Sequence, residues 1–257
     1  MRIVALAAAA AAVLAACASD GAPPDAVDPP GPPAVRVGVV RRHAAELAGE
    51  LPERHAGTQQ ELAAATYVLG HLQRAGYVAR LVDVPVANLV RSTNVVALPP
   101  SGGDPEVVVA VPYDVAPGAP GDEGAAAVGV MLELARALRV AEPRHGVELV
   151  ALGAERGGDR RLGSRRLARV LLDEGADPLV VTVQTVDDAL AGAFAARGPG
   201  ADDLAALARR LGVAPAPPGA ARPPSPDVFT QARFDHLSVA GGPADVGRVL
   251  LAYLTDD

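Results

Sequence analysis

The sequence predicts a three-layer α/β/α sandwich built on a largely parallel, mixed sheet. From about Val35 onward, segments with strand character alternate with amphipathic helical segments, which is typical of βαβ units. The strand candidates are rich in β-branched residues and are bounded by Pro, Gly and Asn. A chain of 257 residues is long enough for one sizeable α/β domain.

The elements are predicted in the following order. The first helix occupies the second half of 35–51, and a second helix runs from an N-cap at Thr58, with Glu61 three residues on, to Gly76. The strands and helices that follow alternate: strands at 77–86, 93–100 and 106–114, a long buried helix at 125–140, a strand at 146–155, a helix at 161–175, a strand at 177–186, and helices at 200–212 and 241–254. The Pro-rich segment Val213–Asp227 is predicted to be irregular.

Composition argues against a nucleic-acid partner. The formal net charge is −7 and only 3% of the residues are aromatic, so neither a basic face for phosphates nor stacking platforms for bases are expected. The Arg-rich run at 157–171 is an exception that we interpret as a solvated helix face rather than an anion site.

The N-terminal segment has the features of a secretory signal. An apolar run from Ile3 to Ala16 follows one basic residue and is too short to span a bilayer comfortably. Leu14–Cys17 resembles the lipobox of bacterial lipoproteins, which implies cleavage before Cys17 and attachment of lipid to it, so that the chain is held at a membrane. Because Ala18 follows the cysteine, the outer membrane is the preferred location in the cell envelope, outside the cytoplasm.

The domain boundaries follow from this interpretation. Residues 1–17 form the signal and lipidated Cys17, 18–34 form a Pro-rich tether, and 35–257 form the folded domain. Cys17 is the only cysteine, so the mature chain has no intramolecular disulfide and no cysteine nucleophile deeper in the sequence.

The motifs of several common enzyme classes are absent from the sequence: the Gly-x-Ser-x-Gly elbow, the phosphate loop, the dinucleotide fingerprint and His-Glu-x-x-His. Six fragments in order nevertheless resemble the co-catalytic di-zinc aminopeptidases, metallopeptidase family 28: RHAGT at 54–58, NVVAL at 94–98, VVVAVPYD at 107–114, GVMLELARAL at 129–138, VELVALGAE at 147–155 and LGS at 162–164. The resemblance implies a zinc-exopeptidase-like fold for 35–257.

The resemblance also implies two zinc ions held by two His and three carboxylates, with a further Glu as general base. Pro112 stands where the first His is expected, while Asp114, the residue that would orient it, remains. Glu123, beside Asp122, falls at the position of the bridging carboxylate. Glu155 matches the general base, and the ligand after it is replaced by Arg156.

The two later positions deviate as well. Thr185 stands where the fourth ligand is expected, and Pro226 replaces the last His. Because proline offers no lone pair and Arg156 is a fixed cation expected to pair with Glu155, Asp114 or Glu123, we expect no zinc cofactor and no catalysis. The leading hypothesis is therefore a degenerate family member, a non-catalytic domain that binds a peptide or protein at the cell envelope.

A competing hypothesis is an active metal-dependent aminopeptidase or hydrolase with a rearranged zinc site. Its ligands would be drawn from a set of polar side chains that the sequence places near strand ends: Asp114, Asp122, Glu123, Glu155, Asp187 and His236. Taken singly, each is better explained as a loop residue or a helix cap. The remaining histidines lack ligand-spaced partners and are expected to be structural: His43, His55, His71 and His145.

Overall fold

The computed structural model describes residues 33–87, 90–143, 145–157, 161–221 and 227–255. Everything that the structure describes belongs to one compact unit, Pro32–Asp257. The predicted signal, Cys17 and nearly all of the tether lie outside the described residues. None of the described helices is long and apolar enough to cross a membrane.

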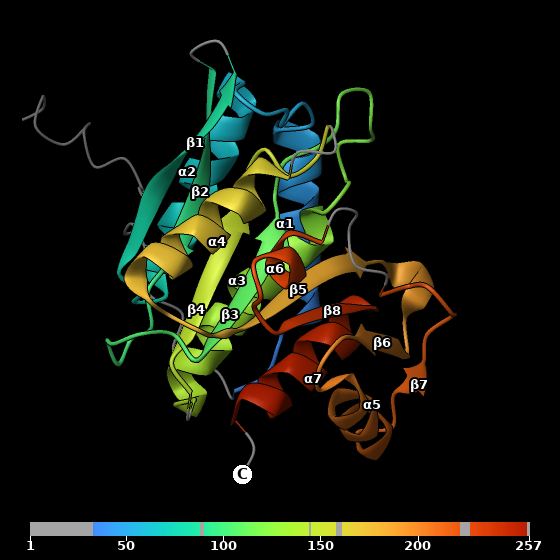
Figure 1. The fold of residues 1–257 in the computed structure, drawn as a ribbon. Helices are drawn as coiled ribbons and strands as arrows, with labels where there is room; N and C mark the ends of the chain where they lie inside the picture. Colours follow the sequence, from blue (N-terminus) through green and yellow to red (C-terminus); the bar gives the residue numbers. More distant parts are fainter. Residues whose placement is uncertain (1–32, 88–89, 144, 158–160, 222–226, 256–257) are drawn as a thin grey trace, which may run out of the picture. The chain divides into compact units, whose positions relative to one another are not determined.

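The described unit contains helices on both sides of one sheet (Figure 1). The helices are α1 (Val37–Glu50), α2 (Gln59–Arg74), α3 (Ala125–Ala141), α4 (Leu162–Glu174), α5 (Ala201–Arg210), α6 (Val228–Gln231) and α7 (Pro243–Thr255), with a 3₁₀ turn η1 at Asp188–Leu190. The strands are β1 (Ala79–Ala87), β2 (Val90–Ala97), β3 (Val107–Pro112), β4 (Val147–Leu152), β5 (Leu179–Val186), β6 (Ala193–Arg197), β7 (Ala214–Pro215) and β8 (His236–Gly241).

The sheet is mixed, with a parallel centre. Its order is β1-β2-β4-β3-β5-β8-β6-β7. The central strands β4, β3, β5 and β8 pair in parallel, whereas β1 with β2, β2 with β4, and β6 with β8 pair antiparallel. The carboxyl ends of the central strands therefore meet at one edge, which is where ligands of open α/β sheets usually lie.

Alternate residues of the central strands pack into two apolar cores. Val109 of β3 and Leu149 of β4 belong to the larger core, which contains buried residues of α1, α2, α3 and α7. Their neighbours Val108 and Val150 belong to the second core, under α4 and α6. Burial on both faces is expected for parallel strands, and it confirms the predicted three-layer sandwich.

Several elements after β5 were not predicted from the sequence. Besides β7, they are the 3₁₀ turn η1, the strands β6 and β8 and the short helix α6, and β8 is a buried strand between β5 and β6. The helix α1 also begins earlier than expected, at Val37. Of the segment predicted to be irregular, Ala214 and Pro215 form the two-residue strand β7.

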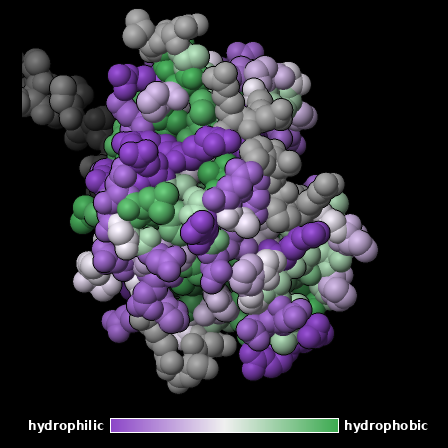
Figure 2. Space-filling view, in the orientation of Figure 1, coloured by the Kyte–Doolittle hydropathy of each residue, from purple (hydrophilic) through white to green (hydrophobic). Residues whose placement is uncertain are grey.

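From Leu162 onward, the Arg-rich run lies on α4. Its Arg165 and Arg169 are exposed, as expected for a solvated helix face. Figure 2 shows that the face of the molecule that carries α4 is mostly hydrophilic and is broken by separate apolar patches. Arg169 forms an ion pair with Asp173 one turn further along the helix, at 2.9 Å.

Candidate functional site

The candidate site lies where β3 and β4 end. These strands are parallel neighbours, and Pro112 at the end of β3 is paired with Leu152 at the end of β4. Asp114 follows the first strand and Glu155 follows the second, so both carboxylates emerge at the same edge of the sheet. The amide of Tyr113 donates to the carbonyl of Leu152 at 3.1 Å, which extends the contact between the two strands into the loops.

Asp114 is fully buried and ties the two loops together. Its Oδ2 accepts hydrogen bonds from the backbone N–H groups of Glu155 at 2.9 Å and Arg156 at 2.8 Å. Its Oδ1 is buried and has no hydrogen-bond partner among the described residues. Burial raises the pKa of Asp114 to about 8, although the hydrogen bond from the Arg156 backbone opposes this shift.

Glu155 is buried and caps the N-terminus of α4. One carboxylate oxygen accepts the backbone N–H of Ser164 at 2.9 Å, and the other accepts the Ser164 hydroxyl at 2.7 Å. The guanidinium of Arg161 lies 3.8 Å away. Burial raises the pKa of Glu155, while the Ser164 hydrogen bonds oppose the rise. The carboxylate that matches the family's general base thus accepts a backbone N–H that the first turn of α4 would otherwise leave without a partner inside the helix.

Arg156 forms an ion pair with Glu123. Its Nη1 contacts Glu123 Oε1, and both side chains are partly buried. A Cβ added to Gly124 would lie 3.2 Å from the carbonyl oxygen of Pro112 and 3.3 Å from Nη2 of Arg156, so the guanidinium lies directly beside this glycine. Of the three partners expected for the Arg156 side chain, the structure selects Glu123, and Asp114 instead binds the Arg156 backbone.

Arg54 organises the loop after β3 and was not singled out from the sequence. Its side chain is fully buried and donates to the carbonyls of Leu47, Leu51, Tyr113, Gly121 and Glu123. These hydrogen bonds join the C-terminal end of α1 to the loop that carries Asp114 and Glu123. The only signal in the sequence was its place at the head of the first family-like fragment.

Glu61 provides a third buried carboxylate close to the site. It accepts hydrogen bonds from the Gly57 amide at 2.5 Å, from the Ala154 amide at 3.2 Å and from the Ser92 hydroxyl. The predicted N-cap is confirmed, because Thr58 Oγ1 accepts the Glu61 N–H at 3.1 Å. The Glu61 side chain links α2 to β2 and to the loop after β4, a role that the capping pattern alone did not indicate.

The remaining predicted site residues are spread out. Asp122 and Asp187 are exposed, and Asp187 accepts the Ala189 N–H at the start of η1.

His236 is buried at the start of β8, with Asp227 Oδ1 2.8 Å from its Nδ1 and Thr182 Oγ1 2.8 Å from its Nε2. Thr185 lies in β5, opposite Ala240 of β8, and Pro226 lies outside the described residues.

The side chains at the edge of the sheet do not fit the zinc pair that the resemblance implies. The Pro112 side chain has no lone pair for a metal ion, and Arg156 brings a positive charge. Both oxygens of Glu155 accept hydrogen bonds from Ser164. In the part of the chain that the structure describes, no group of three or more His, Cys, Asp or Glu side chains is placed to hold a metal ion.

The other histidines have structural neighbours. His43 of α1 and Tyr67 of α2 share a hydrogen bond of 2.7 Å, and the ring of His71 packs against both. His55 Nδ1 lies 3.3 Å from the Val115 carbonyl oxygen, and His145 pairs with Glu106 at 2.7 Å.

Solved structures with the same fold are found among bacterial hydrolases and cyclases. A leucine aminopeptidase precursor from Bacteroides thetaiotaomicron has a TM-score of 0.72 and 15% identity, with 88% of this chain and 99% of that chain covered. A Zn-dependent exopeptidase from Parabacteroides distasonis has a TM-score of 0.68 and 14% identity, with coverages of 88% and 100%. The glutaminyl cyclase of Tannerella forsythia has a TM-score of 0.69 and 15% identity, with coverages of 87% and 99%.

This chain has the zinc-exopeptidase fold. The same architecture serves the glutaminyl cyclases, so the fold is compatible with more than one activity. Neither a scan of protein-family models nor a search of curated proteins found a match.

Proposed function

We propose that this chain is a non-catalytic relative of the zinc exopeptidases that acts by binding a peptide or protein at the cell envelope. The observation that carries the proposal is the ion pair between Arg156 and Glu123. It supports the proposal because the pair joins two positions that the family uses for zinc ligands. A guanidinium there neutralises the carboxylate that a metal would need and repels a divalent cation.

The position of Glu155 supports the same proposal. A general base must be reached by the water that it deprotonates, but Glu155 is only 3% exposed and both of its oxygens are held by hydrogen bonds from Ser164. Asp114, which would orient the missing His, holds two backbone N–H groups instead. The side chains that remain from the family pattern therefore stabilise the loops at the edge of the sheet.

The test uses the full chain, purified in detergent and incubated with zinc before the excess is removed. We expect no stoichiometric zinc by elemental analysis, no release of N-terminal amino acids from peptides, and no cyclisation of N-terminal glutamine, the reaction that the cyclase neighbours suggest. Stoichiometric zinc together with turnover that Glu155→Gln abolishes would establish the competing hypothesis, a rearranged active site. Glu106→Gln, a change at an exposed carboxylate, is the matched control.

The location at the envelope is tested separately. The lipobox-like Leu14–Cys17 and the Pro-rich tether support a lipid anchor on Cys17 that holds the domain outside the cytoplasm, at the outer membrane where the cell has one. Cys17→Ala should release the protein from membranes and abolish incorporation of labelled fatty acid. Unchanged membrane retention, with no label on the wild-type chain, would remove the anchor from the proposal.

A further inference from the structure

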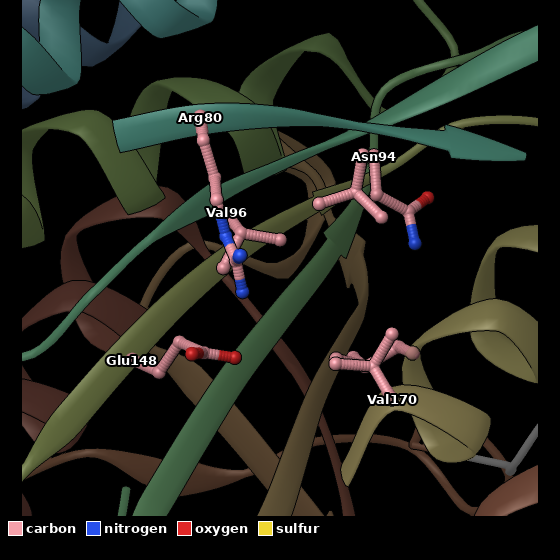
Figure 3. Close-up of a pocket in the computed structure, with 7 residues that line it drawn as sticks. Arg80, Asn94, Val96, Glu148 and Val170 are labelled. Carbon is pink, nitrogen blue, oxygen red and sulfur yellow. The ribbon is translucent and has the colours of Figure 1, made fainter. Parts of the chain in front are cut away.

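A small pocket lies between α4 and the strands β1, β2 and β4, separate from the loops that carry Asp114 and Glu155 (Figure 3). Val96 and Val170 form apolar walls, and Arg80, Asn94 and Glu148 supply the polar groups. In the close-up, the carboxylate of Glu148 and the guanidinium of Arg80 point into the same space from β4 and β1. The pocket therefore combines opposite charges with an apolar lining.

Glu148 is the unusual member of this pocket. It is the second residue of β4 and only 5% exposed, yet no hydrogen bond or ion pair to its carboxylate is found among the described residues. Arg80 pairs with Glu174 instead, at 3.8 Å. Its oxygens are not fully enclosed, because they open into the pocket, where they can accept hydrogen bonds from water or from a ligand. An unpaired carboxylate that lines a pocket is therefore suited to a ligand that brings the donor.

Asn94 does not supply that donor. Its Nδ2 donates to the Gly163 carbonyl at 2.9 Å, and its Oδ1 accepts the Gly153 amide at 3.1 Å. The Asn94 side chain thus fixes the floor of the pocket between β2 and α4. Because no hydrogen bond joins Asn94 to Glu148 among the described residues and Arg80 pairs with Glu174, the Glu148 carboxylate is the group in the pocket that can receive a cationic donor.

We propose that this pocket binds the ammonium group of a small amine, with Glu148 as the acceptor. An ammonium carries three donors and one positive charge, which match the carboxylate, and it is about the size of the one water that the pocket, at about 10 Å³, has room for. The rest of the amine would leave through the opening of the pocket. The amine belongs either to a simple alkylamine or to a free amino acid, whose carboxylate would meet Arg80 at the mouth of the pocket. This inference is independent of the proposed function.

Burial raises the pKa of Glu148 to about 7; repulsion from Glu174 acts in the same direction and Arg80 opposes it. Measurements at pH 8 therefore examine the ionised carboxylate while the amine is still protonated. The probes are methylammonium, glycine and tetramethylammonium, of which the last has the charge but no N–H donor. The readout is the methyl NMR signals of Val96 and Val170 in the full chain.

Methylammonium should shift both signals saturably, and tetramethylammonium should not. Glu148→Gln should weaken the binding of methylammonium at least about tenfold, because a charge-assisted hydrogen bond is lost. Glu106→Gln, the exposed control, should bind like the wild type. If glycine binds more tightly than methylammonium and Arg80→Gln removes the difference, the natural ligand is an amino acid; equal binding identifies a simple amine.

The proposal is overturned if neither methylammonium nor glycine shifts these signals, or if both amines bind Glu148→Gln as they bind the wild type. Should Glu148→Gln fail to fold, the comparison of methylammonium with tetramethylammonium on the wild-type chain decides the question. Failure here leaves the proposed function untouched, because Glu148 takes no part in the Arg156–Glu123 ion pair or in the hydrogen bonds of Glu155.

Discussion

Arg54 shows how one side chain can hold a whole loop in place. Its guanidinium donates to five backbone carbonyls, of the end of α1 and of the loop after β3. We expect Arg54→Met to lower the free energy of unfolding by about 3 kcal/mol or more, since several acceptors lose their donor at once. Arg91→Met, which removes an exposed ion pair with Asp83, should change it by about 0.5 kcal/mol or less. Urea unfolding measures the change in the free energy of unfolding for both variants, and equal changes would refute the role given to Arg54.

Asp114 makes a second residue-scale prediction, on pH. Its pKa is about 8 in the folded chain because of burial, against an ordinary value of 3.8. The folded state therefore keeps a proton that the unfolded state has lost, so the contribution of this group to stability is complete below pH 3.8 and is lost as pH rises to about 8.

Asp114→Asn keeps an oxygen that can accept both backbone N–H groups but cannot ionise. Between pH 5 and pH 8 the wild type should lose stability relative to this variant, on the order of a few kcal/mol. Urea midpoints at several pH values measure the difference, and Asp122→Asn, at an exposed neighbour, should follow the wild type. Parallel profiles for Asp114→Asn and the wild type would show that Asp114 is ionised throughout.

At the scale of elements, α4 depends on a carboxylate from the preceding loop. Its N-cap residue, Arg161, makes no side-chain capping hydrogen bond, and Glu155 supplies the acceptors instead. Glu155→Gln should destabilise the chain by about 1–3 kcal/mol, because a neutral amide accepts less strongly and its NH₂ opposes a donor. Glu174→Gln at the other end of α4 should have little effect.

A double-mutant cycle with Ser164→Ala tests the assignment of this cap. The two changes should be less than additive, because Ser164→Ala removes the hydroxyl hydrogen bond to Glu155 that Glu155→Gln weakens. Strict additivity in urea unfolding would mean that Glu155 stabilises the chain through another contact.

The elements that the sequence predicted are those with local signals. Thr58 and Gly76 mark the ends of the second helix, and runs of Val mark β3 and β4. In contrast, β8 begins with His236 and carries Ser238, which are polar but buried. Thr182 of β5 forms hydrogen bonds with both of them, and Asp227 pairs with His236. Its strand character comes from pairing with β5 and β6, which are distant in sequence, so periodicity could not identify it.

The family-like residues of the candidate site could be predicted from the sequence, but only some of their contacts could. The substitutions at Pro112 and Arg156 are visible in the sequence, and so was an ion pair with Glu123 as one of three alternatives. The capping role of Glu155 was not, because it depends on where α4 begins relative to the end of β4. Such relations are set by the packing of an element against the sheet and are not encoded in residue spacing.

At the scale of the whole molecule, the two apolar cores differ in size and in the polar side chains beside them. The larger core holds α1, α2, α3 and α7 on one face of the sheet, and it is built from Ala, Val and Leu with very few aromatic residues. The second core is smaller and lies beside the polar groups of Glu148, His236 and Thr182. The face covered by α4 and α6 therefore holds buried polar side chains as well as apolar ones.

Two histidines that pack against Tyr67, beside the larger core, are expected to make the fold sensitive to acid. Burial lowers the pKa of His71 to about 4, with His43 and Arg74 acting in the same direction, and burial likewise lowers the pKa of His43, where Glu133 opposes. On acidification the unfolded chain thus binds protons before the folded chain does, so this stabilisation is complete above pH 6.5 and is lost as pH falls towards 4.

His71→Phe keeps a ring against Tyr67 without titrating. It should reduce the loss of unfolding free energy between pH 6.5 and pH 4.5 by about 1–2 kcal/mol, a value discounted for partial exposure. An unchanged pH profile of urea unfolding in His71→Phe would place the acid sensitivity elsewhere.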